Sequence, residues 1–280
     1  MSRLVFPAKD SLPNPAFRLF RSKGFLLAQP HPRLSPWIQC FWLITADKLS
    51  GFSGFNLYAD GGASLNIRFS YSALPEFRFV QHSQRWSLEN TSTMDIMGIR
   101  FKPGGAWQLL GKQGNADPHS PDLPAAWHRL FAPDNKNYPM ITSPQAHFQR
   151  RIAEVETQLL ILAGQQQADT GLIQQTMPGF SRYEGSVENF CLDHGINRRA
   201  FERRYRTETG FSPRQLRELQ RIALARHRLT ITPTLPLTDL ALDAGFFDQA
   251  HFTRQFQKIT GQTPGQYQQR KLSQIYNPAT

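Results

Sequence analysis

An internal repeat near the C-terminus restricts the possible folds of this chain more than any other feature. Six positions match, in order, at an offset of 51 residues. They pair Phe201 with Phe252, Arg203 with Arg254, Tyr205 with Phe256, Gly210 with Gly261, Ser212 with Thr263 and Pro213 with Pro264. A period of this length is typical of a supersecondary unit that occurs more than once. The sequence therefore predicts two similar units in series.

Both units have the pattern of a helix-turn-helix, in which short helices are separated by a glycine turn. Such a motif needs a small residue in the turn and a polar residue that caps the second helix. Gly195 and Gly245 meet the first need. Asn197 and Asp248 meet the second. The glycines are 50 residues apart, so the second turn carries one extra residue. The predicted segments are a first helix-turn-helix at about 186–208, a linker helix at 213–229 and a second helix-turn-helix at about 237–260.

The positive charge of the chain is concentrated in the first unit and the linker helix. The net charge is +11 and the isoelectric point is about 10.0, which favours a polyanionic partner. Residues 195–230 hold ten arginines against three glutamates and no lysine, a net charge of +7 in 36 residues. Arginine forms bidentate pairs with phosphate and with the guanine edge. The pattern therefore indicates double-stranded DNA as the partner.

The second helix of each unit carries polar side chains on its outward face. Arginine can pair with guanine, glutamine with adenine, and glutamate can accept from cytosine. The outward residues are Arg198, Arg199, Glu202, Arg203 and Arg206 in the first unit, and Gln249, His251, Thr253, Arg254 and Gln255 in the second. The residues assigned to phosphates, which position a protein without specifying sequence, are Arg206, Arg214, Arg217 and Gln255. Glu202 has an alternative role, a helix-spaced pair with a neighbouring arginine.

Together these residues resemble the AraC/XylS family of transcription regulators. The first unit matches through Phe190-Cys191, Gly195-Ile196-Asn197, Phe201, Arg203-Arg204-Tyr205 and Gly210-Phe211-Ser212-Pro213. The second matches through Leu240-Ala241, Asp243-Ala244-Gly245-Phe246, Asp248-Gln249-Ala250-His251-Phe252, Arg254-Gln255-Phe256 and Gly261-Gln262-Thr263-Pro264-Gly265-Gln266-Tyr267. The resemblance covers about residues 185–270, and its second half is the more specific. It implies a seven-helix domain whose two recognition helices lie on one side, are joined by a rigid helix and enter successive major grooves.

Carried over by position, the resemblance assigns base-proximal roles in both recognition helices. The candidates are Arg198, Arg199, Glu202, Arg203, Gln249, Ala250, His251, Thr253 and Arg254. The chain departs from the family in two places. Cys191 replaces the small alanine usual in the first unit, which a thiol can tolerate. Phe247 stands where the second turn usually has serine, so we expect Asp248 to cap the helix and to move its start by one residue.

The N-terminal half has a different sequence pattern, which predicts short strands and turns and contains many aromatic residues. Strands are predicted at 41–44, 65–69, 77–80 and 96–101, and turns at 60–62, 102–105 and 132–135. A sandwich or small barrel is the natural closure. A helix follows, capped by Ser143 and ending at Gly164, with apolar Phe148, Ile152, Val155, Leu159 and Leu162 at helical spacing. The predicted fold class is α+β, with a β-rich domain at 1–164, a linker at 165–184 and a DNA-binding domain at 185–272.

The N-terminal half is also similar, more weakly, to β-rich sensor domains found upstream of some AraC-type readers. The similarity rests on residues 31–38 with Phe41-Trp42, on Ala59-Asp60-Gly61-Gly62 and on residues 98–106. It implies effector sensing or dimerisation, and a cupin-like fold is compatible with it. Metal-binding cupins have clustered histidines, whereas His31, His82, His119, His128 and His147 are scattered, so we expect no metal or other cofactor. The tryptophans can line a ligand cavity or pack in a core; they are Trp37, Trp42, Trp86, Trp107 and Trp127.

Other function classes have little support in the sequence. Gly51-Phe52-Ser53-Gly54 lacks the spacing of a nucleophile elbow, and we find no catalytic residues. Two cysteines, Cys40 and Cys191, are too few for a disulfide framework and are expected to be reduced core thiols. No apolar run is long enough to span a membrane, and Pro7 interrupts the start of the chain before a signal-peptide core. We therefore expect a cytoplasmic protein.

The whole pattern predicts a transcription regulator with a β-rich sensor and an AraC-type DNA reader. Its expected partners are double-stranded DNA and, in addition, RNA polymerase, a small-molecule effector in the N-terminal domain and a second copy of the chain. Two alternatives stay open. One is a non-specific architectural DNA-binding protein, and the other is an enzyme with a DNA-tethering tail.

Overall fold

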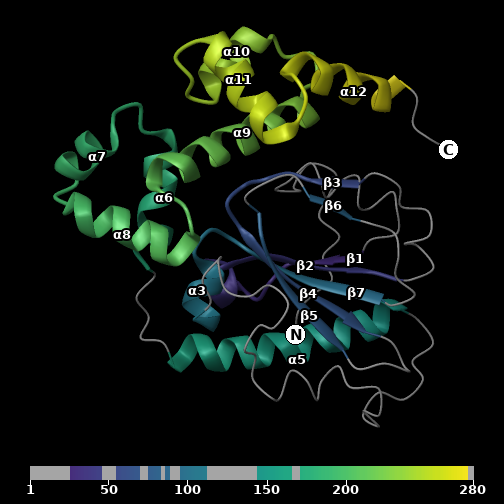
Figure 1. Ribbon diagram of the computed structural model, residues 1–280. Coiled ribbons are helices and arrows are strands. Elements are labelled where there is room, and N and C mark those ends of the chain that lie inside the picture. The colour runs from purple at the N-terminus through teal and green to yellow at the C-terminus, as the bar shows by residue number, and fades with distance from the viewer. Residues whose placement is uncertain are drawn as a thin grey trace.

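The computed structural model describes residues 26–45, 55–69, 75–82, 86–88, 95–111, 144–165 and 171–276. The chain forms a β-rich N-terminal part and a helical C-terminal part, which lie one above the other in Figure 1. The predicted fold class, α+β with a β-rich part followed by an all-α part, is confirmed. The predicted turn at 132–135 lies outside the described residues.

Antiparallel strands form the N-terminal part. The larger sheet has five strands in the order β1-β2-β7-β4-β5, and a second sheet pairs β3 with β6. The strands are β1 (Leu26–Ala28), β2 (Ile38–Ile44), β3 (Phe55–Leu57), β4 (Ala63–Phe69), β5 (Glu76–Gln81), β6 (Trp86–Leu88) and β7 (Asp95–Phe101). The four predicted strands correspond to β2, β4, β5 and β7. The other three strands have three residues each, which is too short for an alternating pattern to be recognised.

One face of the five-stranded sheet packs against the helix α5 (Pro144–Gln165). The buried residues of α5 are those predicted from their spacing, Phe148, Ile152, Val155 and Leu159. They share one core with alternate residues of the central strands, including Leu65, Ile67, Met97 and Ile99. A helix rather than a second sheet therefore covers this face. Two short helical elements also belong to this part, η1 (Pro32–Leu34) and α3 (Gly105–Leu110).

The opposite face of the sheet carries a buried polar cluster. Arg100 forms an ion pair with Asp60 and donates to the Ser64 hydroxyl (3.3 Å), which lies 2.9 Å from Nε2 of His82. Burial would raise the pKa of Asp60, but the Arg100 guanidinium outweighs it and the pKa lies below its ordinary value. Burial, together with the charge of Arg100, lowers the pKa of His82 to about 3. Burial also raises the pKa of the nearby Cys40 thiol to about 12. The cluster therefore contains a neutral imidazole and a neutral thiol at neutral pH.

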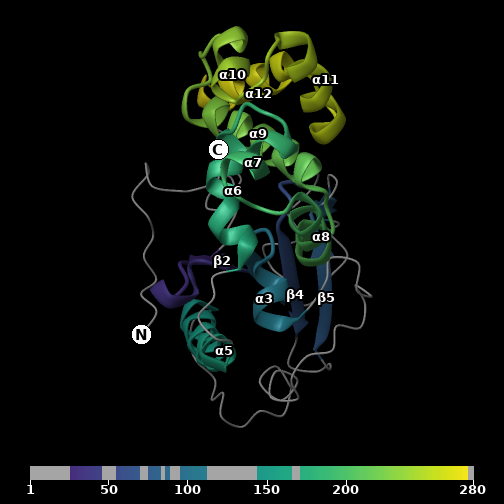
Figure 2. The same cartoon turned by 90° about the vertical axis from the view of Figure 1, so that its left-hand side faces the viewer.

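Seven helices make up the described part of the C-terminal region, residues 171–276, as the family resemblance implies. They are α6 (Leu172–Arg182), α7 (Val187–Asp193), α8 (Arg198–Thr209), α9 (Pro213–Ile231), α10 (Leu237–Asp243), α11 (Gln249–Thr260) and α12 (Pro264–Tyr276). Figure 2 shows them stacked beyond one end of the β-rich part. The long helix α9 contributes Leu216 to a core with α6, α7 and α8. It contributes Ile222, Ala225 and Leu229 to a second core with α10, α11 and α12.

Helix α6 lies within the segment predicted as a linker, 165–184. The polar stretch from Met177 to Gly185 predicts a break, yet its residues up to Arg182 are inside the helix. Ile173, Met177 and Phe180 point into the core of the first helix-turn-helix. The linker prediction was therefore wrong for residues 172–182, because three apolar residues at helical spacing outweigh one proline.

We expect His82 to make the fold sensitive to acid. The unfolded chain takes up a proton on this histidine below about pH 6.5, and the folded chain does so only near pH 3. The free energy of unfolding should therefore fall as the pH drops through this window, by about 2 kcal/mol at pH 5 from this group alone. Urea unfolding of the wild type and of His82→Gln at pH 7 and pH 5 measures this contribution. Equal pH dependence of the two proteins would contradict it.

Candidate nucleic-acid interface

The first helix-turn-helix is formed by α7 and α8. The Ser186 side chain accepts from the backbone N–H of Asn189 and caps α7. Gly195 takes a positive φ of 64° in the turn, a conformation that glycine adopts without a steric penalty. The Asn197 side chain then accepts from the Ala200 N–H and caps α8. The predicted turn at Gly195 and the predicted cap by Asn197 are confirmed.

The second helix-turn-helix repeats this local structure in α10 and α11. Gly245 has a φ of 79°, and the Asp248 side chain accepts from the His251 N–H at 2.6 Å. The predicted cap by Asp248 is confirmed, and α11 starts at Gln249. Its neighbour Phe247 lies almost fully in solvent.

Most of the predicted contact residues lie on the surface. The exposed ones are Arg198, Arg199, Arg203, Arg206, Arg214, Gln249, Ala250 and Arg254, and the partly buried ones are Glu202, Arg217, His251, Thr253 and Gln255. Their elements are α8 for residues 198–206, α9 for Arg214 and Arg217, and α11 for residues 249–255.

Arg198 and Glu202 are paired with each other at the start of α8. Arg198 donates to Glu202 at 3.0 Å and to Glu188 of α7 at 3.3 Å. The alternative role of Glu202, as the partner of a nearby arginine, is thus the one seen in the free protein. Within the described part of the chain, no ion-pair or hydrogen-bond partner engages the side chains of Arg199, Arg203 or Arg254. These three guanidinium groups are available to a ligand.

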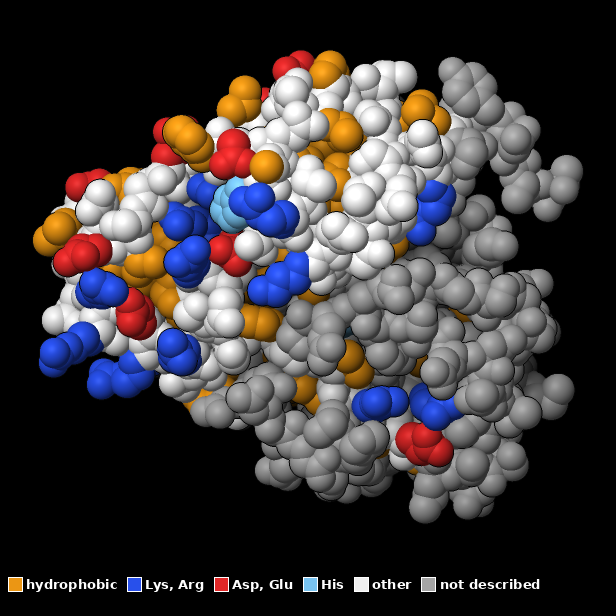
Figure 3. All heavy atoms as spheres, turned by 45° about the horizontal axis from the view of Figure 1, so that its top comes forward, with side chains coloured by type: hydrophobic (Ala, Val, Ile, Leu, Met, Phe, Trp, Pro, Cys, Tyr) orange, Lys and Arg blue, Asp and Glu red, His pale blue; other side chains and the backbone are white. Residues whose placement is uncertain are grey.

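A groove of about 470 Å³ runs between the two units along the first half of α9. Arg198 and Glu202 border it from α8, and Phe246 and His251 border it from the second unit. Five arginines line it, at positions 198, 206, 214, 217 and 221, together with the three glutamates 188, 202 and 218. Figure 3 shows Lys and Arg side chains gathered on the helical part of the molecule, with acidic and apolar side chains among them. The first turns of both recognition helices therefore open onto one basic surface.

Arg217 and Arg221 hold the segment between α6 and α7 rather than projecting into solvent. Arg217 donates to the carbonyl of Gly185 at 2.7 Å and lies 4.8 Å from the centre of the Phe180 ring. Arg221 donates to the carbonyl of Tyr183 at 2.9 Å. Burial, with the nearby Arg221, lowers the pKa of Arg217, although a guanidinium remains charged at neutral pH. These bonds commit part of each guanidinium group to the fold.

Sequence comparison agrees with this geometry. A family model described as "Helix-turn-helix domain" matches residues 191–270. The HTH-type transcriptional activator RhaR of Klebsiella pneumoniae is 33% identical over 84 residues, which is 30% of this chain and 30% of RhaR. The virulence regulon transcriptional activator VirF of Yersinia enterocolitica is 30% identical over 87 residues, 31% of this chain and 32% of VirF. Residues 191–270 are a helix-turn-helix domain of the AraC type.

The comparisons give less information about the residues outside the AraC-type domain. The chain spans less than a third of the length of these curated relatives. A second family model, described as "Domain of unknown function (DUF6597)", matches residues 27–116. Among solved structures, ToxT from Vibrio cholerae has a TM-score of 0.42 at 11% identity, over 88% of this chain and 98% of ToxT. The DNA-binding domain of AdpA with a target DNA has a TM-score of 0.32 at 24% identity, over 39% of this chain and 94% of that domain.

The AraC-type domain packs against the β-rich part through the loop of residues 58–62, here named the docking loop. Tyr58 is buried in the core of the second unit, with the Arg226 guanidinium 4.1 Å from its ring centre. Its hydroxyl accepts from Gln262 and from Arg270, both at 2.9 Å. Gln220 of α9 donates to the carbonyl of Asp60. No local sequence pattern singled out Tyr58, whose partners are far away in the chain.

The first unit also contacts the β-rich part. Gln81 donates to the carbonyl of Thr209 at 2.8 Å, and Gln108 donates to Glu208 at 3.3 Å. Both acceptors lie at the C-terminal end of the recognition helix α8. The β-rich part therefore contacts both helix-turn-helix units and the helix that joins them.

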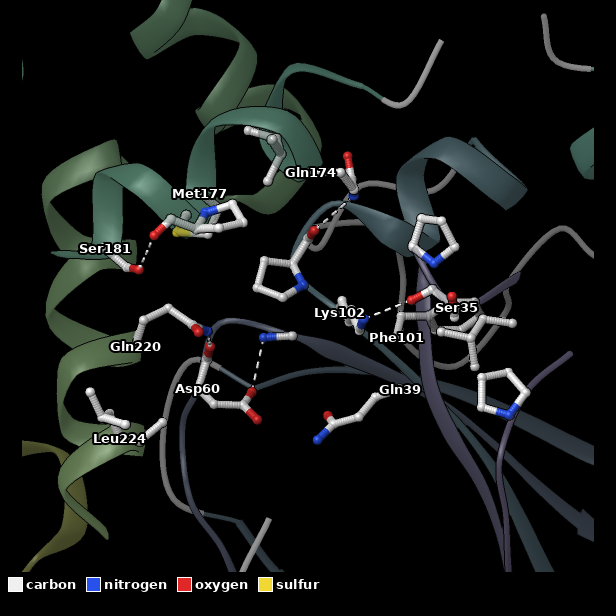
Figure 4. Close-up of a pocket in the computed structure, with 18 of the residues that line it drawn as sticks. Ser35, Gln39, Asp60, Phe101, Lys102, Gln174, Met177, Ser181, Gln220 and Leu224 are labelled. Atoms are coloured by element: carbon white, nitrogen blue, oxygen red, sulfur yellow. Dashed lines mark hydrogen bonds between the residues drawn. The ribbon is translucent and has the colours of Figure 1, made fainter. Parts of the chain in front are cut away.

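A cavity of about 820 Å³ lies beside the docking loop, between the β-rich part and helices α6 and α9. Figure 4 shows Phe101 and Lys102 on one side and Met177, Gln220 and Leu224 on the other, with Asp60 next to Gln220. Trp37, Trp42 and Trp107 do not line this cavity, and the side chains of Trp86 and Trp127 lie outside the part of the chain that the structure describes. Within the same residues, no group of three or more potential metal ligands occurs, and no helix is long and apolar enough to cross a membrane.

We expect Arg217 to contribute to stability and Arg214 to contribute little. Arg217→Ala removes charge-assisted hydrogen bonds to two carbonyls and should lower the free energy of unfolding by about 2 kcal/mol. Arg214 is exposed and pairs with Glu218 on the same helix, and Arg214→Ala should change the free energy by at most about 0.5 kcal/mol. Urea unfolding of the two variants makes the comparison. Equal effects would contradict the structural role of Arg217.

Substitution at Gly61 should separate the β-rich part from α9. Gly61 has a φ of 76°, and a Cβ there would overlap the buried Leu216 side chain of α9. Gly111 has a φ of 63° but no atom of the described residues within 4 Å of such a Cβ, so it is the matched control. Both alanine variants should lose about 1 kcal/mol to backbone strain. Gly61→Ala should lose a further 1–3 kcal/mol, roughly, to overpacking and should increase the radius of gyration in solution scattering. The same radius and stability for both variants would show that the docking loop does not hold the two parts together.

Proposed function

We propose that this protein is a sequence-specific DNA-binding transcription regulator whose helices α8 and α11 enter two successive major grooves. The observation that carries this proposal is the basic groove along α9, because the first turns of both recognition helices open onto it. Recognition helices contact base edges through their N-terminal residues. The names of RhaR and VirF, both transcriptional activators, support a regulatory role.

The length of α9 suits two grooves on one side of the DNA. Its 19 residues span about 28 Å at roughly 1.5 Å per residue. Successive major grooves on one face are about 34 Å apart. Since α8 packs near the start of α9 and α11 packs on its second half, α9 fixes the separation of the two recognition helices, and we infer that this separation matches successive major grooves.

The contacts that we assign follow from exposure and from the existing partners. Bases are contacted by Arg199 and Arg203 from α8, and by Gln249, Ala250, His251, Thr253 and Arg254 from α11. Phosphates are bound by Arg206, Arg214 and Gln255. Glu202 orients Arg198, which reaches the DNA beside it. We assign Arg217 to the support of the segment before α7 rather than to phosphate.

The β-rich part adjusts how the two recognition helices meet the DNA. It contacts the end of α8 through Gln81 and Gln108, and it contacts α9 and α12 through the docking loop. An effector in the adjacent 820 Å³ cavity would touch both parts and change their fit. This role needs no catalysis and no cofactor, and it places the protein in the compartment that holds the DNA. A second copy of the chain and RNA polymerase are the further partners that we propose.

Selection of bound fragments from a random DNA library, at about 150 mM salt, tests the proposal. Non-specific electrostatic binding weakens steeply as salt rises, so sequence-specific complexes are enriched. The full chain should recover a motif with two conserved blocks about one helical turn apart. A featureless pool from folded protein would contradict sequence-specific recognition and would favour an architectural DNA-binding protein.

Substitution of the base-contacting arginines should change sequence preference, each in a different block. Arg203→Ala and Arg254→Ala should each cost about 1–3 kcal/mol at particular base pairs and relax selection there. Arg206→Ala is the matched control, because loss of a phosphate contact weakens binding by a similar factor on every sequence. Affinities for the selected site and its single-base variants make the comparison. If Arg203→Ala or Arg254→Ala weakens binding to the selected site and to all its single-base variants equally, that residue does not recognise a base.

A further inference from the structure

Phe247 is the most exposed large apolar side chain in the described part of the chain, with 94% of its surface in solvent. It is the extra residue of the second turn. The N–H of Phe246 donates to the carbonyl of Ala241 at 2.9 Å, and in the first turn the N–H of Ile196 donates to Cys191 at 2.8 Å. Phe246 therefore takes the position of Ile196, and Phe247 has no counterpart in the first unit.

The usual structural reason for an apolar residue before a helix cap does not apply to Phe247. A residue in this position commonly packs on the fourth residue of the helix, which here is Phe252. Phe246 already occupies that contact, at 5.3 Å between the ring centres, and Phe252 is fully buried. Phe247 thus adds nothing to the core that would explain a large apolar side chain.

The surroundings of Phe247 are complementary to DNA. Phe246, the residue before it, and His251 of α11 line the basic groove, and the Arg221 guanidinium approaches the turn at Gly245. On the other side, Asp248 caps α11, and the exposed Gln249 and Ala250 form its first turn. A polyanion bound in the groove would bring a base edge to the start of α11, where this ring stands.

We propose that Phe247 contacts the 5-methyl group of one thymine in the major groove and makes that base pair a specificity determinant of the second unit. An apolar side chain can read a T·A pair through this methyl group. The contact would also cover an aromatic ring that the free protein leaves in water. The inference rests on the proposed function, since it requires that α11 enters the major groove.

The test combines a protein variant with removal of the methyl group from the DNA. Each thymine of the second block of the selected site is replaced in turn by uracil, which lacks only the 5-methyl group. At one position the wild type should bind about fourfold more weakly, the effect of one buried methyl-sized group. Phe247→Ala should bind the thymine and uracil sites equally, and Phe247→Leu should keep part of the discrimination. Leu242→Ala, which removes another exposed apolar side chain from α10, should behave like the wild type.

The outcomes separate this inference from the function on which it rests. If the wild type recovers a two-block motif and Phe247→Ala recovers the same motif with the same uracil effects, the inference is wrong and the proposed function stands. Phe247 would then be available to a protein partner instead. If folded wild-type protein recovers no motif, both are overturned. Since the side chain is exposed, the variants should unfold at the same urea concentration as the wild type.

Discussion

The helix α9 is the constraint on which the rest of the structure depends. Its buried face contributes Leu216 to the core of the first helix-turn-helix and Ile222, Ala225 and Leu229 to the core of the second. Because one continuous helix supplies both cores, neither unit can rotate without breaking its own packing. The β-rich part packs against the same helix through Gly61 and Gln220. A change in the β-rich part can therefore reach both recognition helices through α9.

The arginines of residues 195–230 have two physical roles that composition alone does not distinguish: some are exposed, and others hold the fold together. Arg199 and Arg203 have no partner among the described residues and project from α8. Arg217 and Arg226 are instead committed to the fold, the first to the carbonyl of Gly185 and the second to the Tyr58 ring. The net charge correctly located the basic surface. It does not distinguish the exposed guanidinium groups from those that contact backbone carbonyls or an aromatic ring.

Much of the helical domain could be predicted from the sequence because its signals are local. A capping side chain and a turn glycine each act within a few residues, so Asn197, Gly245 and Asp248 had the predicted roles. The docking loop could not be predicted in this way, since nothing near Tyr58 indicates that Gln262 and Arg270 will reach its hydroxyl. Arg214 and Arg217 both lie near the start of α9, so the sequence around them does not distinguish their roles. They differ because residues 183–185 fold against α9 and place two carbonyl groups beside Arg217. Helix α6 was not predicted, because Ile173, Met177 and Phe180 recur at helical spacing in a segment that is otherwise mostly polar and contains Pro178.

The most direct test of the central claim is the affinity of the full chain for its selected site with five base pairs inserted between the two blocks. Such an insertion moves one block by about half a helical turn to the other side of the DNA. If α9 holds the two recognition helices rigidly, binding should fall to the level of non-specific DNA. An unchanged affinity would contradict the account, because it would mean that the units bind independently or that only one of them recognises sequence.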